Sequence, residues 1–354
     1  MTNQDKPIHT EGSDPGGTTS EILASSSFRE MRAVFIGAIL IVLAVNIAMI
    51  LYLPKSTTNL GYWIIGKKWQ MLLRLPAPID WLILGDSSGN QGLMPKILEE
   101  RLGGRSVNLC TIADMTVLND AWMLDTYLKS KGTLRAVLVV HVYDVWNRDF
   151  DARMMARIPM AIEGVRQLKP PVRLTPYKIL RGFLDRYLPL YYQHETVASL
   201  IKFPLSHPQH ELLWEEDGFM SAVAAKPSAV EGDARNHLTF VRETQFRLSE
   251  SNRTALEYLA DAAERHSFDL FIANSPLYEG LIRDAAFVRY YSDMERAIGR
   301  VIAGRRNVHY ILRAPMTFAK EQLQNADHVT RSAAVEYTTR VVAEIEASQQ
   351  QGSR

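Results

Sequence analysis

The chain has little cysteine, no excess of charge of either sign, and no repeated pairs of metal-ligating residues. Its 354 residues include one cysteine, Cys110, which excludes a disulfide within the chain, and no zinc-type cysteine spacing exists. The 40 Lys and Arg are balanced by 39 Asp and Glu, so charge gives no reason to expect nucleic acid as a partner. We expect no cofactor and no metal. The length allows one sizeable domain with accessory segments.

One stretch near the N-terminus has no charged side chain. Residues 33–53 are apolar throughout, and about 21 such residues can span a hydrocarbon core of roughly 30 Å. A buried helix of a soluble protein is rarely apolar on every face over this length, so we expect a transmembrane anchor. The preceding residues, 1–32, are rich in Ser, Thr, Gly and acidic side chains and are expected to form a disordered tail.

The charges that flank the anchor indicate its orientation. Arg29 and Arg32 precede it, whereas only Lys55 follows closely. The positive-inside rule therefore favours a cytoplasmic tail and a main domain outside the cytoplasm, periplasmic or at the cell surface, held by a single pass of the inner membrane. A cleaved signal peptide is less favoured, since the apolar run is long and the tail before it extended.

Residues 54–77 are expected to form a juxtamembrane linker. They mix aromatic side chains such as Tyr62 and Trp63 with Lys67 and Lys68. Such a mixture suits a segment lying at the membrane interface, and it equally suits the first packing helix of the domain. Both alternatives stay open at this point.

Beyond Pro78, short apolar runs alternate with segments of helical periodicity. The expected strands are 80–84, 106–110, 136–140, 268–273 and 308–312. The expected helices are 96–102, 117–128, 253–266, 284–301 and 330–345. This alternation predicts that residues 78–348 form an α/β domain, doubly wound around a mainly parallel sheet.

The alternation breaks between about residues 150 and 239. This segment contains eight prolines and a basic stretch at 153–186, and we expect a helical insertion here. It is either an ordinary insertion whose basic side chains are solvated, or a lid that binds an anionic polymer or the membrane surface.

Ser87 follows the first expected strand directly, where open α/β sheets place their binding crevice. The residues Gly85-Asp86-Ser87 after an apolar strand resemble the nucleophile block of the SGNH/GDSL hydrolases. The resemblance implies a three-layer sandwich with Ser87 as the nucleophile. It also implies a partner histidine just before the last helix, and His328 stands there.

The third member of the catalytic group is less clear from the sequence. The family's acid lies three residues before the histidine, where this chain has Asn325, and Asp327 directly precedes His328. Asparagine can hold an imidazole in place but does not stabilise its cation. A Ser87–His328 dyad and a triad that includes Asp327 are both compatible with the sequence.

The resemblance also implies donors for an oxyanion. Besides the Ser87 N–H, the candidates are the backbone N–H of Ala113, the hydroxyl of Tyr143, which stands where the family has asparagine, and Asn147. His141 is the runner-up for the base, although it can also be read as an ordinary residue at the end of a strand.

An N-terminal anchor followed by such a domain resembles the branch of the family that contains the alginate O-acetylation and lipoteichoic-acid D-alanylation proteins. This implies a membrane-anchored acyltransferase or esterase that modifies an extracytoplasmic polysaccharide through a serine acyl-enzyme. The implied partners are the membrane, a membrane-bound O-acyltransferase and the glycan. A simple carboxylester hydrolase and a non-catalytic accessory of a polysaccharide export or modification complex are the alternatives.

Overall fold

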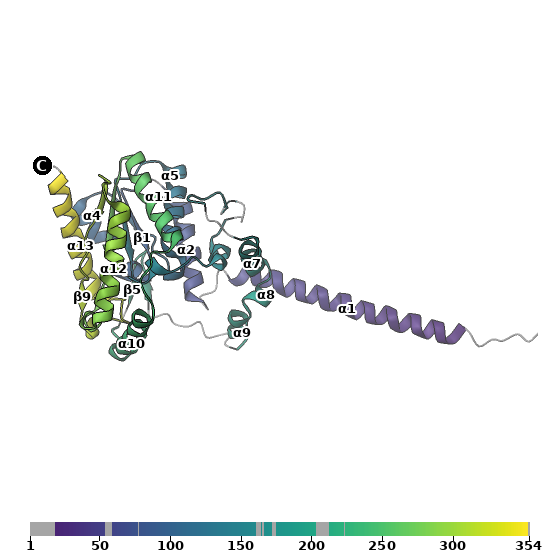
Figure 1. The fold of residues 1–354 in the computed structure, drawn as a ribbon. Coiled ribbons are helices and arrows are strands. Elements are labelled where there is room, and N and C mark those ends of the chain that lie inside the picture. Colours follow the sequence, from purple (N-terminus) through teal and green to yellow (C-terminus); the bar gives the residue numbers. More distant parts are fainter. Residues whose placement is uncertain are drawn as a thin grey trace, which may run out of the picture.

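The computed structural model describes residues 18–53, 59–76, 78–160, 164, 166–171, 175–202, 212–222 and 224–352. Figure 1 shows one long helix, α1 (Thr18–Tyr52), projecting from a body in which helices surround a sheet. Three short helices lie near the place where α1 meets this body. They are α7 (Pro176–Tyr187), α8 (Pro189–Tyr192) and α9 (His194–Lys202).

The sheet of the body has five strands in the order β2-β1-β3-β6-β8. They are β1 (Trp81–Gly85), β2 (Ser106–Asn108), β3 (Ala136–His141), β6 (Asp269–Asn274) and β8 (Val308–Tyr310). All neighbouring pairs are parallel, which confirms the predicted α/β fold with a mainly parallel sheet. Because the chain passes from β1 to β2 and returns to β3 on the other side of β1, the direction of winding reverses between β1 and β3.

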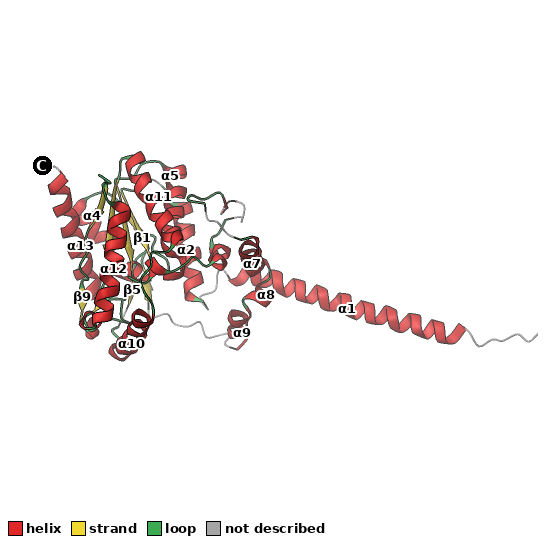
Figure 2. Cartoon of the chain, in the orientation of Figure 1, coloured by secondary structure: helices red, strands yellow, loops and turns green. Residues whose placement is uncertain are grey.

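Helices cover both faces of the sheet (Figure 2). Leu82 and Leu84 of β1 point into one apolar cluster, and Trp81 and Ile83 point into the other, as expected for alternating side chains of a strand. The first cluster is covered by α2 (Leu60–Arg74), α5 (Thr116–Lys131), α11 (Glu250–His266) and α12 (Ala285–Ile302). The second is covered by α4 (Pro95–Leu102) and α13 (Arg331–Gly352). The five helices expected from periodicity are thus all present.

Helix α1 carries the expected apolar segment. Residues 30–52 are long and apolar enough to cross a membrane. Most of their side chains are exposed, Val34 to 73%, whereas a core helix of a soluble protein would bury them. An exposed apolar surface of this extent is typical of a segment that contacts a membrane or another protein.

The tail before the anchor is shorter than predicted. We expected residues 1–32 to be disordered, but α1 already begins at Thr18. Once an apolar segment is helical, each further residue adds a hydrogen bond without a new nucleation step, so the helix extends into the polar sequence before it. Residues 1–17 of the expected tail lie outside the described part of the chain.

Helix α2 packs into the body, which decides between the two alternatives for the segment after the anchor. Trp69 is fully buried, and so is Lys68. The Lys68 ammonium donates hydrogen bonds to the carbonyl oxygens of Asn108, at 2.8 Å, and Gly218, at 2.6 Å. The lysine that suggested an interfacial segment therefore joins α2 to the sheet. Residues 54–58 of the expected linker are not among those described.

The insertion is only partly helical. Besides α7, α8, α9 and α10 (Pro227–Glu243), it contains an antiparallel pair, β4 (Leu212–Trp214) and β5 (Met220–Ala222). Strands of three residues are too short to produce a recognisable apolar alternation, which explains why they were not predicted. Helices α7 and α8 contact α1, while β5 contacts α3 (Ser87–Gly92). The insertion therefore touches both the anchor and the helix that begins with Ser87.

Short elements complete the described chain. They are the 3-10 helices η2 (Ala113–Met115), η3 (Val145–Asn147), η4 (Ala152–Arg157), η5 (Leu281–Arg283) and η6 (Lys320–Gln322), and the parallel pair β7 (Leu277–Tyr278) and β9 (Thr317–Phe318).

Candidate functional site

The turn from β1 into α3 places Ser87 at the carboxyl end of the sheet, where the winding reverses. Gly85 makes this turn possible, because its φ is +145° and a Cβ there would lie 1.9 Å from the carbonyl oxygen of Val140. Asp86 then caps α3, since its Oδ1 accepts a hydrogen bond from the Ser88 N–H at 2.8 Å. Ligands of open α/β sheets bind at such a reversal point.

Ser87 has the more accessible of the two hydroxyls in this turn. It is partly buried, and its Oγ forms no hydrogen bond with any residue that the structure describes. Ser88 differs, because it is fully buried and its Oγ donates to Asp86 Oδ1 at 2.5 Å. Of the two, Ser87 is therefore the one whose oxygen can meet a substrate.

His328 is held at one ring nitrogen by two side chains. Its Nδ1 is 2.7 Å from Asn325 Oδ1 and is also bonded to Asp327 Oδ1. Its Nε2 has no hydrogen-bond partner among the described residues and is not a buried atom. Burial by itself would lower the pKa of His328, but the carboxylate of Asp327, together with those of Asp86 and Asp233, raises this pKa above its ordinary value. Asn325 and Asp327, the two candidates that the sequence offered, thus both contact the same ring nitrogen of His328.

Ser87 and His328 lie on elements that pack together. Helices α3 and α13 are in contact, and the Thr338 hydroxyl of α13 donates to the carbonyl oxygen of Gly92 in α3 at 2.9 Å. Asp86, the neighbour of Ser87, is close enough for its charge to act on His328. No hydrogen bond joins the Ser87 and His328 side chains, both of which are described. The structure brings the two residues to one edge of the sheet without a closed serine–histidine contact.

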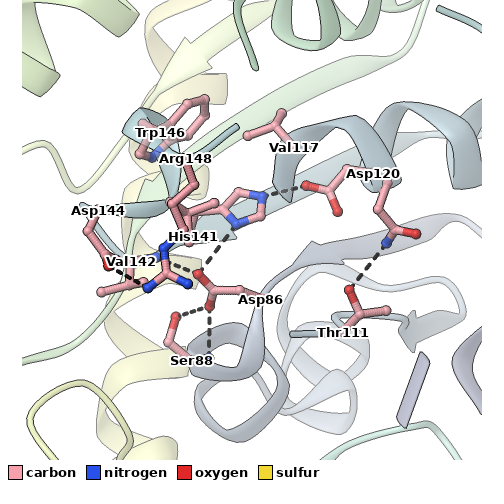
Figure 3. A network of polar contacts seen from close by, with 12 residues as sticks. Asp86, Ser88, Thr111, Val117, Asp120, His141, Val142, Asp144, Trp146 and Arg148 are labelled. Carbon is pink, nitrogen blue, oxygen red and sulfur yellow. Dashed lines mark hydrogen bonds and ion pairs between the residues drawn. The ribbon is translucent and has the colours of Figure 1, made fainter. Parts of the chain in front are cut away.

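A buried acid–histidine–acid triplet lies next to the Ser87 turn (Figure 3). His141, the last residue of β3, has its Nε2 2.5 Å from Asp120 Oδ2 and its Nδ1 3.4 Å from Asp86 Oδ2. The three side chains are at most 1% exposed. Asp86 Oδ2 also accepts a hydrogen bond from the Val142 N–H at 2.7 Å, so Asp86 ties the end of β1 to the end of β3.

The charges of this triplet follow from its geometry. Burial alone would lower the pKa of His141, but the two carboxylates raise it to about 10, so the imidazole is a cation at neutral pH. Burial alone would raise the pKa of Asp86, but the ion pair with His141 and the hydrogen bonds from Ser88 and Val142 bring it down to about 2. The pKa of Asp120 is raised, chiefly by burial. A protonated imidazole has no lone pair for a proton, so the runner-up base His141 acts here as a buried counter-ion.

The three other predicted site residues have partners of their own. Ala113 begins η2 and is partly buried. The Tyr143 hydroxyl is 2.6 Å from Nδ1 of His237, and the Tyr143 ring is buried. Asn147 Oδ1 accepts a hydrogen bond from the Arg247 N–H at 3.2 Å. No hydrogen bond links any of the three to Ser87 or His328, so their predicted role with the oxyanion stays a prediction.

Two residues of α10 extend the group around His328. Asp233 Oδ2 lies 3.4 Å from His237 Nε2, and ligand atoms of Asp233, His237 and Asp327 lie within 4.8 Å of one another, a spacing that could hold a metal ion. Burial would lower the pKa of His237, but its hydrogen bond with Asp233 and the charge of Asp327 raise it.

Asp120, Asp233 and His237 were not predicted from the sequence as site residues. Asp120 lies inside the helix expected at 117–128, where an acidic residue normally faces solvent. Asp233 and His237 are four residues apart and therefore share one face of a helix, but they fall in the insertion, where no individual helix was predicted. Their i,i+4 spacing was the one available signal.

No family model matches the chain, and no curated protein matches its sequence. The functional argument therefore depends on the fold and on the geometry of the site. These define an α/β protein with a parallel sheet, an accessible serine at the reversal point between β1 and β3, and a histidine oriented by a carboxylate and an amide.

Proposed function

We propose that the chain is a membrane-anchored, SGNH-like serine esterase or acyltransferase that acts on an extracytoplasmic polysaccharide through an acyl-enzyme on Ser87. The observation that carries the proposal is the state of His328. One ring nitrogen, Nδ1, is held by Asp327 and Asn325. The other, Nε2, has no hydrogen-bond partner among the described residues, and neither has the Ser87 hydroxyl at the same edge of the sheet. A serine, a base and a group that orients the base are the parts of a serine nucleophile.

In the proposed reaction, Ser87 Oγ attacks the carbonyl carbon of an ester while His328 Nε2 takes the hydroxyl proton. Asp327 and Asn325 accept a hydrogen bond from the Nδ1–H, which leaves the Nε2 lone pair directed away from them. The leaving alcohol receives the proton from Nε2, and the acyl group stays on Ser87. Water or a sugar hydroxyl then gives its proton to Nε2 and takes the acyl group. Ser87 Oγ, as the leaving group, takes that proton back from Nε2, which restores the hydroxyl and completes hydrolysis or transfer. The Ser87–His328 contact has to close to about 3 Å as the ester binds, and such contacts are often longer without substrate.

The cellular side of the proposal depends on α1. Arg29 and Arg32 favour a cytoplasmic N-terminus, so the domain would face the periplasm or the cell surface. There it would meet the polysaccharide and a membrane-bound O-acyltransferase as the source of acyl groups. Protease added to intact spheroplasts should then degrade the domain and spare the N-terminal residues. If the domain were protected from the protease, it would lie in the cytoplasm and could not act on an extracytoplasmic polysaccharide.

The test of the chemistry uses the full-length protein in detergent. A fluorophosphonate probe should label Ser87, as located by mass spectrometry of the peptides, and a short p-nitrophenyl ester should be hydrolysed. Ser87→Ala should abolish both, since loss of a catalytic nucleophile can cost on the order of 10⁶-fold in kcat. Ser292→Ala, which removes a hydroxyl from α12, should change neither. An active Ser87→Ala variant of normal stability would exclude the proposed nucleophile.

One observation favours a second candidate, a non-catalytic accessory of a polysaccharide export or modification complex. The Ser87 and His328 side chains form no hydrogen bond, and an accessory would not need one. An accessory should bind the polysaccharide without labelling at Ser87, and Ser87→Ala should leave that binding and the modification in cells unchanged. Labelling of Ser87 that His328→Ala removes would exclude this candidate.

A further inference from the structure

Helices α7 and α8 are attached to the apolar part of α1 by its one buried polar side chain. Asn46 is 6% exposed, although most residues around it in α1 are open. Its Nδ2 donates to the carbonyl oxygen of Tyr187 at 2.6 Å, and its Oδ1 accepts from the Leu190 N–H at 3.4 Å. The corner between α7 and α8 is therefore fixed against the segment that is long and apolar enough to cross a membrane.

The position of Asn46 in α1 shows how far the corner between α7 and α8 lies from the end of that helix. Asn46 stands six residues before Tyr52, the end of α1, which is about 9 Å along the helix at about 1.5 Å per residue. Amphipathic helices at membrane surfaces bury their apolar face by about 5–10 Å. The short helices expose large apolar side chains that suit this depth, among them Tyr177, Leu180 and Tyr191. If α1 spans the membrane, α7 and α8 lie in the leaflet on the side of the domain, whichever side that is.

A cavity of about 190 Å³ opens between α1, α2 and these helices. Its lining includes Met49 and Ile50 from the last turn of α1, and Arg157, Arg186 and Gln193 from the insertion. At about 30 Å³ for each water molecule, the volume equals that of roughly six waters, which is enough for a phosphate group. Because α1 supplies one wall, the cavity lies at the level where lipid headgroups meet the apolar core.

The two arginines of the cavity leave donors and charge uncompensated. The Arg157 side chain is only 10% exposed, stacks 3.8 Å from the centre of the Tyr62 ring, and pairs with Asp185 at 2.8 Å. Its Nε is a buried donor without a hydrogen-bond partner. The Arg186 guanidinium donates to the carbonyl oxygen of Met160 and forms no ion pair with any described residue. Among the residues that the structure describes, the cavity thus has one cation with an ion pair and one without.

We propose that this cavity binds the phosphate-bearing headgroup of an anionic lipid from the leaflet on the side of the domain. The Arg157 Nε and the Arg186 guanidinium would donate to the phosphate oxygens, and charged donors in a fork are well suited to phosphate. Basic pockets beside membrane helices are a recognised site for anionic headgroups. The proposal depends on the membrane anchoring by α1 in the proposed function, but not on the chemistry of Ser87.

The test uses the full-length protein in a neutral detergent, with dihexanoyl-phosphatidylglycerol, dihexanoyl-phosphatidylcholine and inorganic phosphate as the three probes. Native mass spectrometry measures bound lipid, and the shift of the melting temperature gives the affinity. We expect phosphatidylglycerol to bind at least tenfold more tightly than phosphatidylcholine, and inorganic phosphate to give no comparable shift. Arg186→Gln should weaken phosphatidylglycerol binding about tenfold or more, because a hydrogen bond to a charged group is lost.

Lys178→Gln is the matched control, since it removes one positive charge from the same helix at an exposed position outside the cavity. Its binding should equal that of the unchanged protein. Thr196→Leu, which narrows the cavity without changing its charge, should also weaken binding and serves if Arg186→Gln fails to fold.

Equal losses in Lys178→Gln and Arg186→Gln would mean general attraction to a basic surface and would overturn the site. If inorganic phosphate raised the melting temperature as much as phosphatidylglycerol does, the cavity would be a site for soluble anions. If phosphatidylcholine bound as tightly as phosphatidylglycerol, the cavity would not select an anionic headgroup. Alkaline carbonate extraction of cell membranes tests the anchor separately, and fluorophosphonate labelling tests Ser87. A failure of the lipid site is therefore distinguishable from a failure of either.

Discussion

Replacing Asp327 by asparagine should slow ester hydrolysis and move its pH dependence. Asp327 and Asn325 both contact Nδ1 of His328, so the variant keeps an acceptor for the Nδ1 proton and loses only the carboxylate. The substitution therefore separates two contributions of a triad acid. One is the choice of the imidazole tautomer, and the other is stabilisation of the imidazolium that forms in the transition state.

The size of the loss in kcat/KM depends on the contact between Asn325 and His328 Nδ1, which the variant keeps. Removing the acid of a serine triad costs about 10⁴-fold when the imidazole is left in the wrong tautomer. Here Asn325, at 2.7 Å, continues to hold the tautomer, so the loss should be that of one charged hydrogen bond. At about 1.5–3 kcal/mol, this corresponds to roughly 10- to 150-fold in kcat/KM. Removing both contacts, as in Asn325→Ala with Asp327→Ala, should approach the larger figure.

The pH dependence has a definite sign. His328 acts as a base only when it is neutral, so activity rises with pH through the pKa of His328. Burial alone would lower that pKa, and the carboxylates of Asp327, Asp86 and Asp233 raise it. The acid limb of kcat/KM should therefore have its midpoint above the ordinary histidine value of about 6.5. In Asp327→Asn the largest raising influence is gone, so the midpoint should move to lower pH.

The assay is hydrolysis of p-nitrophenyl acetate by the full-length protein in detergent, from pH 5 to pH 9. Asp149→Asn is the control, because Asp149 is exposed and lies outside the His328 group, and it should leave both rate and midpoint unchanged. A loss near 10⁴-fold in Asp327→Asn would show that Asn325 does not hold the tautomer. A midpoint that stays in place, or moves to higher pH, would refute the assignment of His328 as the base.

Two further predictions concern the buried charges. His141→Phe leaves the carboxylates of Asp86 and Asp120 buried without their cation, so it should lower the free energy of unfolding by about 3–5 kcal/mol, which denaturant titration with and without the variant would measure. Burial lowers the pKa of Lys68 to about 7. Between pH 7 and about 10.5 the unfolded chain therefore binds more protons than the folded chain, so the contribution of Lys68 to the free energy of unfolding rises with pH over this range. His141, with a pKa of about 10 against 6.5, has the opposite effect between pH 6.5 and 10. The melting temperature should therefore change little from pH 7 to pH 10 and should fall over this range in Lys68→Met; a flat profile in that variant would contradict the assignment.

The sheet could be predicted because its strands are short apolar runs with clear boundaries. Residues 136–140 are apolar throughout and include three β-branched valines, and they form the central strand β3. Ser87 could be placed at the carboxyl end of its strand for the same reason, since β1 ends abruptly at Gly85. These features are local, and the periodicity of the sequence contains them.

The residues that the sequence did not indicate depend on contacts between distant segments. The buried state of Lys68 requires carbonyl groups from Asn108 and Gly218, which are 40 and 150 residues away. Asp120 faces the core because His141 neutralises it, and a helix pattern alone predicts an acidic residue in solvent. The division of roles between Asn325 and Asp327 depends on how the loop before α13 turns. Composition and spacing do not contain such information.

The segment between anchor and domain should be required for folding, although it looks like a linker in the sequence. Three apolar side chains of α2 are fully buried, Ile65, Trp69 and Leu72, and at about 1.5–3 kcal/mol each they contribute about 5–9 kcal/mol, comparable with the whole stability of many domains. Lys68 also bonds to Asn108, whose Nδ2 in turn donates to the carbonyl oxygen of Gly89 in α3, so α2 lies two hydrogen bonds from the helix that begins with Ser87. A chain that begins at Asn59 should therefore melt cooperatively and react with the fluorophosphonate probe. One that begins at Pro78 should show no cooperative melt, and equal stability of the two would mean that the burial of α2 contributes little.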